Sequence, residues 1–272
     1  MKNMLKLESR KDEIIAMYEK GMTPYAISKE IGEYEQSVAN LLRRYSHLPK
    51  RVPYLIDESY FEKIDSVDKA YFFGLIAADG SIVENGNNHQ MTISLQSEDK
   101  YILELLRTSM KAEVPVREYA QSYQRKDDHI YTQSRFVTGN KKICSDLIAH
   151  GIIPRKSKTL EALLQEVEES YKIDFVRGYF DGNGSIFKSI TSGTQEKNYI
   201  TFRGTEEILS DIKNYLEIGN TKIYFGKGSA EGTGTYTWRF GAKKDIIKFK
   251  QAIYHENVGD FYLTRKKEKF LW

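Results

Sequence analysis

Two side chains that could ligate a cation, Asp79 and Asn183, each stand directly before a glycine at the end of an apolar stretch. The stretches are residues 72–80 (FFGLIAADG) and 176–184 (VRGYFDGNG), and their composition predicts two helices that end at the glycines. The C-terminus of a helix has a partial negative charge, which makes it an unfavourable place for a carboxylate. A bound divalent cation would offset this repulsion. Mg²⁺ prefers carboxylate and carbonyl oxygens. Asp79 therefore indicates a cation site, with a purely structural helix-terminal acid as the alternative.

Small residues recur at intervals of four in both stretches, as Gly74 with Ala78 and as Gly178 with Gly182. This spacing allows two helix backbones to approach each other closely. We therefore expect the two helices to lie side by side with their C-terminal ends together. The acid at one end and the amide at the other would then be neighbours on a pseudo-two-fold axis.

A larger unit must position these helices, and the sequence contains it twice, at residues 65–165 and 166–272. Residues 91–96 alternate apolar and polar side chains, which predicts a strand with one polar face. Both units are predicted to follow the order αββαββα. In the first, we expect helices at 66–79, 98–110 and 141–150, with Ser97 as the cap of the second, and strands at 91–96, 114–123 and 130–137. In the second, we expect helices at 171–183, 206–216 and 243–254, with Thr205 as the cap of the second, and strands at 199–203, 221–226 and 235–240.

Short landmarks align the two units. Residues 135–136 (Arg-Phe) and 141–142 (Lys-Lys) correspond to 239–240 (Arg-Phe) and 243–244 (Lys-Lys), if the first unit has a short insertion. Likewise, residues 154–156 (PRK) correspond to 264–266 (TRK). A duplication of this kind implies internal pseudo-two-fold symmetry.

Both nonapeptides, with the element order around them, resemble the LAGLIDADG homing endonucleases over residues 65–270. The resemblance implies an α+β fold in which two sheets form a DNA-binding saddle, and metal-dependent hydrolysis of duplex DNA. It implies that Mg²⁺ or another divalent cation is bound by Asp79 and Asn183 and by the main-chain oxygens of Ala78 and Gly182. It also implies basic residues at the scissile phosphates, for which Lys156 and Lys266 match by position. Solvated surface lysines are the alternative for these two.

The downstream motif departs from the family at Asn183, where an acid is expected. An amide oxygen can ligate a metal, but it has no charge and cannot act as a base. Asp181 cannot replace it, because two residues correspond to about 200° around a helix. The two half-sites should therefore differ in metal affinity, which would limit the protein to nicking, slow its double-strand cleavage or abolish cleavage while DNA binding remains.

The saddle of the family implies that outward-facing strand residues contact bases, since Arg and Lys pair with guanine and Gln with adenine. The candidates are Thr92, Ser94, Gln96, Gln133, Arg135, Arg203, Lys222, Tyr224 and Arg239. Plain solvent exposure is the alternative for each. Their inward neighbours are expected in the core, namely Ile93, Leu95, Phe136, Phe202, Ile223, Phe225 and Trp238.

Residues 1–48 are predicted to form three short helices that resemble a helix-turn-helix domain. Thr23 and Pro24 begin the second helix, and glycines follow the first two. The third helix presents polar side chains that suit base and phosphate contacts, namely Gln36, Ser37, Asn40, Arg43 and Arg44. A three-helix bundle that binds a protein is the alternative. Residues 49–64, with two prolines and a basic pair, are predicted to be a linker.

The composition suits a globular DNA-binding protein without requiring one. The 272 residues have a net charge of +3, and 40% are hydrophobic. One cysteine, Cys144, excludes an internal disulfide and favours a reducing cytoplasm. No apolar run reaches membrane-spanning length, and no Cys/His cluster has zinc spacing. We thus expect a cytoplasmic monomer that binds double-stranded DNA.

The leading hypothesis is a single-chain endonuclease for a long, asymmetric duplex site. The alternative is a catalytically inactive transcriptional regulator derived from the same scaffold. Asn183 favours the regulator, whereas Asp79 and the intact first motif favour the enzyme.

Overall fold

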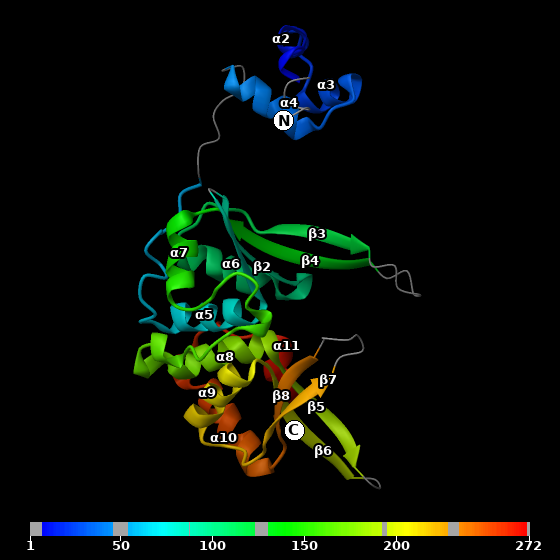
Figure 1. Ribbon diagram of the computed structural model, residues 1–272. Helices are drawn as coiled ribbons and strands as arrows, with labels where there is room; N and C mark the ends of the chain where they lie inside the picture. The colour runs from blue at the N-terminus through cyan, green and yellow to red at the C-terminus, as the bar shows by residue number, and fades with distance from the viewer. Residues whose placement is uncertain are drawn as a thin grey trace. The chain divides into compact units, whose positions relative to one another are not determined.

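The computed structural model describes residues 7–45, 54–86, 88–122, 130–191, 195–227 and 234–270 (Figure 1). The chain divides into two compact units, Met1–Pro53 and Tyr54–Trp272. No helix in the described ranges has the length and apolar composition that crossing a membrane requires.

The first unit contains three helices, α2 (Lys11–Glu19), α3 (Pro24–Ile31) and α4 (Glu35–Arg44). Thr23 begins α3 as predicted, because its hydroxyl accepts a hydrogen bond from the Ala26 amide. Gly32 ends α3 with φ of 68°, a left-handed conformation that glycine adopts without strain. The helices enclose a small apolar core of Leu7, Ile14, Ile27, Ile31, Val38, Leu41 and Leu42.

The second unit contains the predicted repeat. Its first half consists of α5 (Val67–Asp79), β1 (Gly80–Asn85), β2 (Asn88–Gln96), α6 (Lys100–Ser109), β3 (Arg117–Ser122), β4 (Ile130–Thr138) and α7 (Lys141–Ala149). Its second half consists of α8 (Lys172–Asn183), β5 (Gly184–Thr191), β6 (Gln195–Gly204), α9 (Glu206–Leu216), β7 (Ile223–Lys227), β8 (Gly234–Phe240) and α10 (Lys243–Ile253). A short helix, α11 (Thr264–Lys267), follows. The sheets are antiparallel with equivalent strand orders, β1-β2-β4-β3 and β5-β6-β8-β7, which confirms the duplication.

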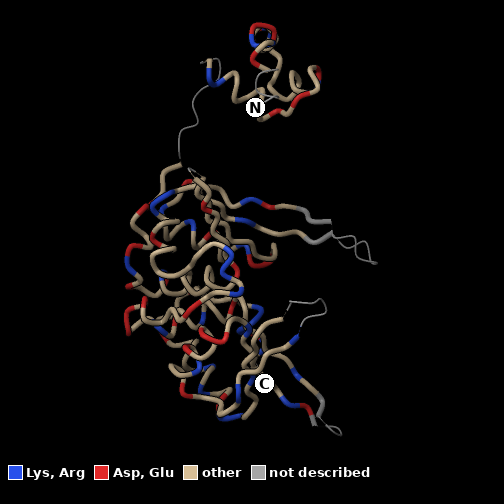
Figure 2. The backbone as a smooth tube through the Cα atoms, in the orientation of Figure 1, with Lys and Arg blue, Asp and Glu red and all other residues tan. Residues whose placement is uncertain are grey.

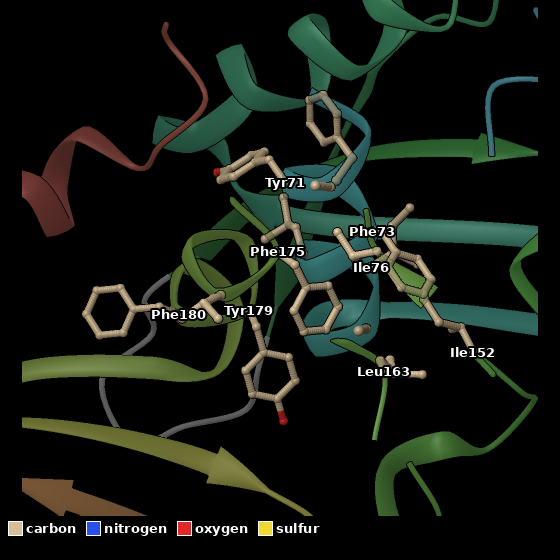
Figure 3. Close-up of a cluster of buried hydrophobic side chains, with 14 of the residues drawn as sticks. Tyr71, Phe73, Ile76, Ile152, Leu163, Phe175, Tyr179 and Phe180 are labelled. Carbon is tan, nitrogen blue, oxygen red and sulfur yellow. The ribbon is translucent and has the colours of Figure 1, made fainter. Parts of the chain in front are cut away.

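The paired helices α5 and α8 lie side by side between the two halves (Figure 1). Helices α6 and α7 pack on the first sheet, and α9 and α10 pack on the second. One continuous apolar cluster spans both repeats. In the part drawn in Figure 3, the rings of Phe73 in α5 and Phe175 in α8 lie 5.5 Å apart.

Glycines permit the close contact of α5 with α8, as the spacing predicts. A Cβ added at Gly74 would fall within 3.0 Å of the Phe175 carbonyl oxygen, and one at Gly178 within 3.0 Å of the Tyr71 carbonyl oxygen. Real Cβ atoms are essentially never found so close. The two helix backbones are thus in direct contact, and their C-terminal ends meet.

In the second unit, helix caps agree with the sequence at two positions and differ at a third. Ser66 accepts a hydrogen bond from the Lys69 amide, and Thr205 accepts one from the Ile208 amide. The predicted Ser97 cap is wrong. A 3-10 turn, Ser97–Asp99, precedes α6, so Ser97 is not at the helix start, and its buried hydroxyl has no hydrogen-bond partner within the described ranges.

The strand register corrects the alignment of the two repeats by two residues. Phe136 pairs with Ile93, and Trp238 pairs with Phe202; Ile93 and Phe202 in turn face the glycines that begin β1 and β5. Phe136 is therefore equivalent to Trp238, and no insertion is needed before α7. By the same register, the residue equivalent to Arg135 is a threonine.

Phe225 does not belong to the core, contrary to the prediction. Its side chain is 52% exposed, because β7 is an edge strand that offers few neighbours. The ring contacts Tyr236 edge-on at a centroid distance of 5.1 Å. Of the other predicted core neighbours, Ile223 is half-buried, and the following are buried: Ile93, Leu95, Phe136, Phe202 and Trp238.

Candidate active site

Asp79 is the last residue of α5, and its solvent-accessible carboxylate lies at the end of the helix pair. It faces the end of α8, because a Cβ on Gly182 would lie 3.3 Å from Asp79 Oδ2. No hydrogen bond or ion pair within the described residues engages this carboxylate. Crowding by protein atoms raises the pKa of Asp79 from its usual value, while Lys266 and Lys156 act in the opposite direction. The helix ends therefore offer one carboxylate that is available to a ligand.

Lys156 lies beside this carboxylate at the end of α5. It is only 7% exposed, and its Nζ donates a hydrogen bond to the Ala78 carbonyl oxygen at 3.2 Å. Burial lowers the pKa of Lys156 to about 8, against the opposing effect of Asp79. The surface-lysine alternative is thus wrong for Lys156. Because this is its only acceptor in the described part of the chain, two N–H groups can bind another group.

Lys266 caps the end of α8 through its whole ammonium group. It is 5% exposed, and its Nζ donates hydrogen bonds to the carbonyl oxygens of Phe180 (2.7 Å), Asp181 (2.6 Å) and Gly184 (2.7 Å). Burial lowers the pKa of Lys266 to about 8, with Asp181 acting in the opposite direction. Lys266 is therefore no surface lysine either, and all three N–H groups are occupied.

Asn183 ends α8 at the position equivalent to that of Asp79 in α5. Burial raises the pKa of Tyr179 to about 12, and a hydrogen bond with the Asn183 side chain acts in the opposite direction. The Tyr179 hydroxyl itself donates to the Arg203 carbonyl oxygen at 2.9 Å. The Asn183 amide thus lies beside the Tyr179 hydroxyl of its own repeat, while a Cβ on the neighbouring Gly182 would meet Ala78.

An open cavity of about 350 Å³ adjoins these groups. Lys156, Tyr179, Asn183, Arg203 and Thr235 are among the residues that line it. Three cationic residues, Lys156, Lys158 and Arg203, and several hydrogen-bond donors suit an anionic group.

Asp181 has a structural role that the sequence reasoning missed. Its Oδ2 accepts hydrogen bonds from the Tyr71 hydroxyl (2.9 Å) and from the Leu263 amide (2.8 Å). Burial raises the pKa of Asp181 to about 6, with Lys266 acting in the opposite direction. Asp181 thereby anchors the segment that carries Lys266 to the helix pair.

The donors at the helix ends fit one divalent cation if a further ligand supplies oxygens. No group of three or more His, Cys, Asp and Glu side chains could hold a metal in the ranges that the structure describes. Asp79 brings one carboxylate and Asn183 an uncharged oxygen, whereas Ala78 O is already bonded to Lys156. Mg²⁺ often binds one or two carboxylates and completes its shell with water and substrate phosphates. The Asp79 side fits such a cation, and the Asn183 side supplies no charge for a second.

The polar face of the first sheet presents all five predicted base-contacting residues of that repeat together. Thr92, Ser94 and Gln96 alternate along β2 with buried apolar residues. Arg135 Nε donates to Ser94 Oγ at 3.0 Å, and its guanidinium lies 4.9 Å from the centre of the Tyr119 ring. Gln133 pairs with Gln96 across the strands, on the same face.

The second sheet presents an equivalent face with more positive charge. Arg203 and Arg239 are exposed on it, and Arg239 lies over the rings of Phe187 (5.2 Å) and Tyr199 (5.7 Å). Tyr224 is 45% exposed in β7, and Lys222 immediately precedes that strand. Basic segments along the strands of both sheets are visible in Figure 2.

In the first unit, three of the predicted residues form one row on α4, in which Gln36 and Asn40 are exposed and Arg43 is half-buried. Gln36 Nε2 and Arg43 NH1 both donate to Asn40 Oδ1, at 2.8 and 3.2 Å. Arg44 lies apart from this row and pairs with Glu8 at 2.8 Å. Ser37 is half-buried.

Comparison with known proteins agrees with the duplicated architecture. Residues 66–143 match the family model described as "LAGLIDADG-like domain". No curated protein matches the chain. The homing endonuclease I-WcaI bound to its DNA recognition sequence is similar in structure, with a TM-score of 0.53 and 14% identity over 79% of this chain and 92% of that one. Two further DNA complexes align less closely. I-GzeII gives a TM-score of 0.47 with 12% identity over 74% of this chain and 87% of that one. I-LtrWI gives a TM-score of 0.43 with 15% identity over 79% and 88%. Residues 66–143 therefore match a LAGLIDADG-like domain, and the fold of the chain is similar to that of the homing endonuclease I-WcaI.

Proposed function

We propose that this protein is a site-specific DNA endonuclease that hydrolyses phosphodiester bonds in a long, asymmetric duplex site. The observation that carries the proposal is Asp79, a carboxylate with no partner among the described residues, at the paired helix ends of this fold. The similar structure of I-WcaI is a homing endonuclease bound to its DNA recognition sequence, which supports the same class of substrate. The chain would act as a monomer, because it contains both repeats.

Asp79 and Lys156, at the helix ends, would have different roles in hydrolysis. Asp79 would hold a divalent cation, Mg²⁺ or a similar ion, which when bound lowers the pKa of water and stabilises negative charge on phosphate oxygens. Lys156 has two free N–H groups beside Asp79, so it can donate to the phosphate as charge develops. Partial exclusion of water strengthens both interactions.

The two polar sheet faces would read the duplex on either side of the cut. Arg135 and Arg239 are oriented by aromatic rings and can donate two hydrogen bonds to a guanine edge. Gln96 and Gln133 can pair with adenine. Because the two faces carry different side chains, the preferred site should be asymmetric.

A randomised duplex library tests this proposal. The full chain is incubated with the library and Mg²⁺, with the two strands tagged differently, and bound and cut strands are sequenced after denaturation. We expect cuts at one position within a common sequence. Bound molecules without a cut in either strand, at any concentration of Mg²⁺ or Mn²⁺, would instead support the second candidate function.

That second candidate is a DNA-binding regulator without nuclease activity. Asn183 is the observation that favours it, because an uncharged residue stands where the symmetric repeat has Asp79. Sequence-specific binding needs the sheet faces and no metal, so both candidates predict binding to the library. Only cleavage separates them.

The N-terminal unit would extend the footprint on DNA as a helix-turn-helix domain. The row formed by Gln36, Asn40 and Arg43 lies on one face of α4, with Gln36 and Asn40 exposed and Arg43 half-buried, and it combines amide groups with a cation. Such a face suits a major groove, where amides contact bases and arginines contact phosphates or guanine.

Substitution of Arg43 tests this role in the full chain. We expect Arg43→Gln to reduce the slope of log K against log salt concentration by about one unit, since each neutralised phosphate contributes about 0.9. Fluorescence anisotropy with the selected duplex measures it. Arg44→Gln is the matched control and should change the slope less, because Arg44 is paired with Glu8. An unchanged slope in both variants would favour a protein partner for this unit.

A further inference from the structure

We propose that the two halves of the candidate active site, at the ends of α5 and α8, are not equivalent. The chain then cuts one DNA strand, and it binds the other strand at the active site without cutting it. This inference rests on the proposed endonuclease function. It assigns the cut to the half formed by Asp79 and Lys156. It assigns to Asn183 and Lys266 a structural role.

The first asymmetry is in the negative charge. Asp79 and Asn183 occupy equivalent last positions of α5 and α8, each before a glycine that begins a strand. The Asp79 carboxylate has no partner within the described ranges, whereas Asn183 offers only an uncharged amide beside the Tyr179 hydroxyl. The residue equivalent to Tyr179 in α5 is Leu75, which has no polar group. One end thus presents a free charge, and the other presents an uncharged amide.

The second asymmetry is in the ammonium groups, and it is independent of the first. Lys156 donates one hydrogen bond, to the Ala78 carbonyl oxygen at 3.2 Å. Lys266 donates three hydrogen bonds, all to carbonyl oxygens, at 2.6 to 2.7 Å. An ammonium group has no donor beyond these three. Lys266 can bind a phosphate only by giving up a bond at the end of α8, whereas Lys156 can bind one as it stands.

The chemistry at the competent half needs one water per cut. The water oxygen forms a bond to phosphorus, and the bond from phosphorus to one sugar oxygen breaks. That oxygen takes up a proton, so the products are a phosphate end and a hydroxyl end on the same strand. Charge gathers on the phosphate oxygens during the step, where Lys156 can donate to it. The half with Asn183 lacks the carboxylate, and the lysine equivalent to Lys156, Lys266, has no N–H group left to donate.

The strand-tagged library used for the proposed function provides the test. We expect cuts in one strand only, always the same strand relative to the bound sequence. Cuts in both strands at a fixed offset and similar rates would overturn this inference and leave the endonuclease function intact. The absence of cuts in either strand would overturn both. Asn183→Asp should raise cutting of the second strand at least about tenfold, and no rise would show that the missing charge is not the cause.

A pair of lysine variants gives a readout that does not depend on activity. Lys266→Met should lower the melting temperature of the full chain by at least about 5 °C, because three hydrogen bonds from a charged donor are lost. Lys156→Met, the matched control, should change it by less than about 2 °C while removing most cutting of the first strand. Equal melting temperatures for the two variants would show that the lysines are equivalent and would contradict the assignment.

Discussion

Asp79→Asn is expected to remove DNA cleavage and leave duplex binding intact. The substitution keeps the size of the side chain and one acceptor oxygen, but it removes the negative charge of the free carboxylate at the helix ends. Mutation of a residue that only supports a metal ligand typically lowers metal affinity or activity about 10- to 100-fold. Because Asp79 would be a ligand itself, we expect the rate of DNA cutting to fall by more than about 100-fold. Rates of strand cutting with Mg²⁺ measure it.

Binding and folding controls make this result specific. Anisotropy with Ca²⁺ in place of Mg²⁺ should give the same affinity for the variant and the unchanged chain, since the sheet faces are untouched. Glu256→Gln, at an exposed acid in a 3-10 turn, removes an equal charge and should cut at the normal rate. Normal cutting by Asp79→Asn would show that the carboxylate has only a structural role at the helix end.

The parts of the fold that follow from local spacing could be predicted from the sequence. The spacing of four residues between Gly74 and Ala78, and the same spacing between Gly178 and Gly182, predicts two closely packed helices. The structure contains this helix pair. Helix starts at Ser66 and Thr205 were also predictable, because a cap involves residues three apart. These features depend on neighbours in the chain, which the sequence displays directly.

Features that depend on distant contacts could not be predicted in this way. Lys266 is buried because the C-terminal segment folds back on α8, where Asp181 binds the Leu263 amide 82 residues away. The two-residue shift that makes Phe136 equivalent to Trp238 is set by pairing across strands. Phe225 follows the strand pattern, but an edge strand has too few neighbours to bury it. In each case, the burial or register of the residue depends on contacts with segments that are distant in the sequence.

Gly178→Ala is expected to destabilise the protein by about 3 kcal/mol. The added Cβ would fall within 3.0 Å of the Tyr71 carbonyl oxygen and also close to the Leu75 amide, both of them backbone groups that cannot rotate away. Helices α5 and α8 would have to separate, and overpacking of this kind costs about 1–3 kcal/mol or more. The higher helix propensity of alanine offsets at most about 1 kcal/mol of this loss in the free energy of unfolding. Denaturant unfolding of the full chain measures the change in the free energy of unfolding.

The same substitution also tests whether the helix pair sets the geometry of the candidate site. Gly226→Ala is the matched control, because a Cβ there would lie 3.6 Å from its nearest neighbour, the Thr235 carbonyl oxygen. That variant should unfold within about 0.5 kcal/mol of the unchanged chain, as surface substitutions usually do. If Gly178→Ala were equally harmless, α5 and α8 could not be in backbone contact. Since that contact is what holds Asp79 against the end of α8, a folded but loosened Gly178→Ala chain should retain DNA binding and lose cutting.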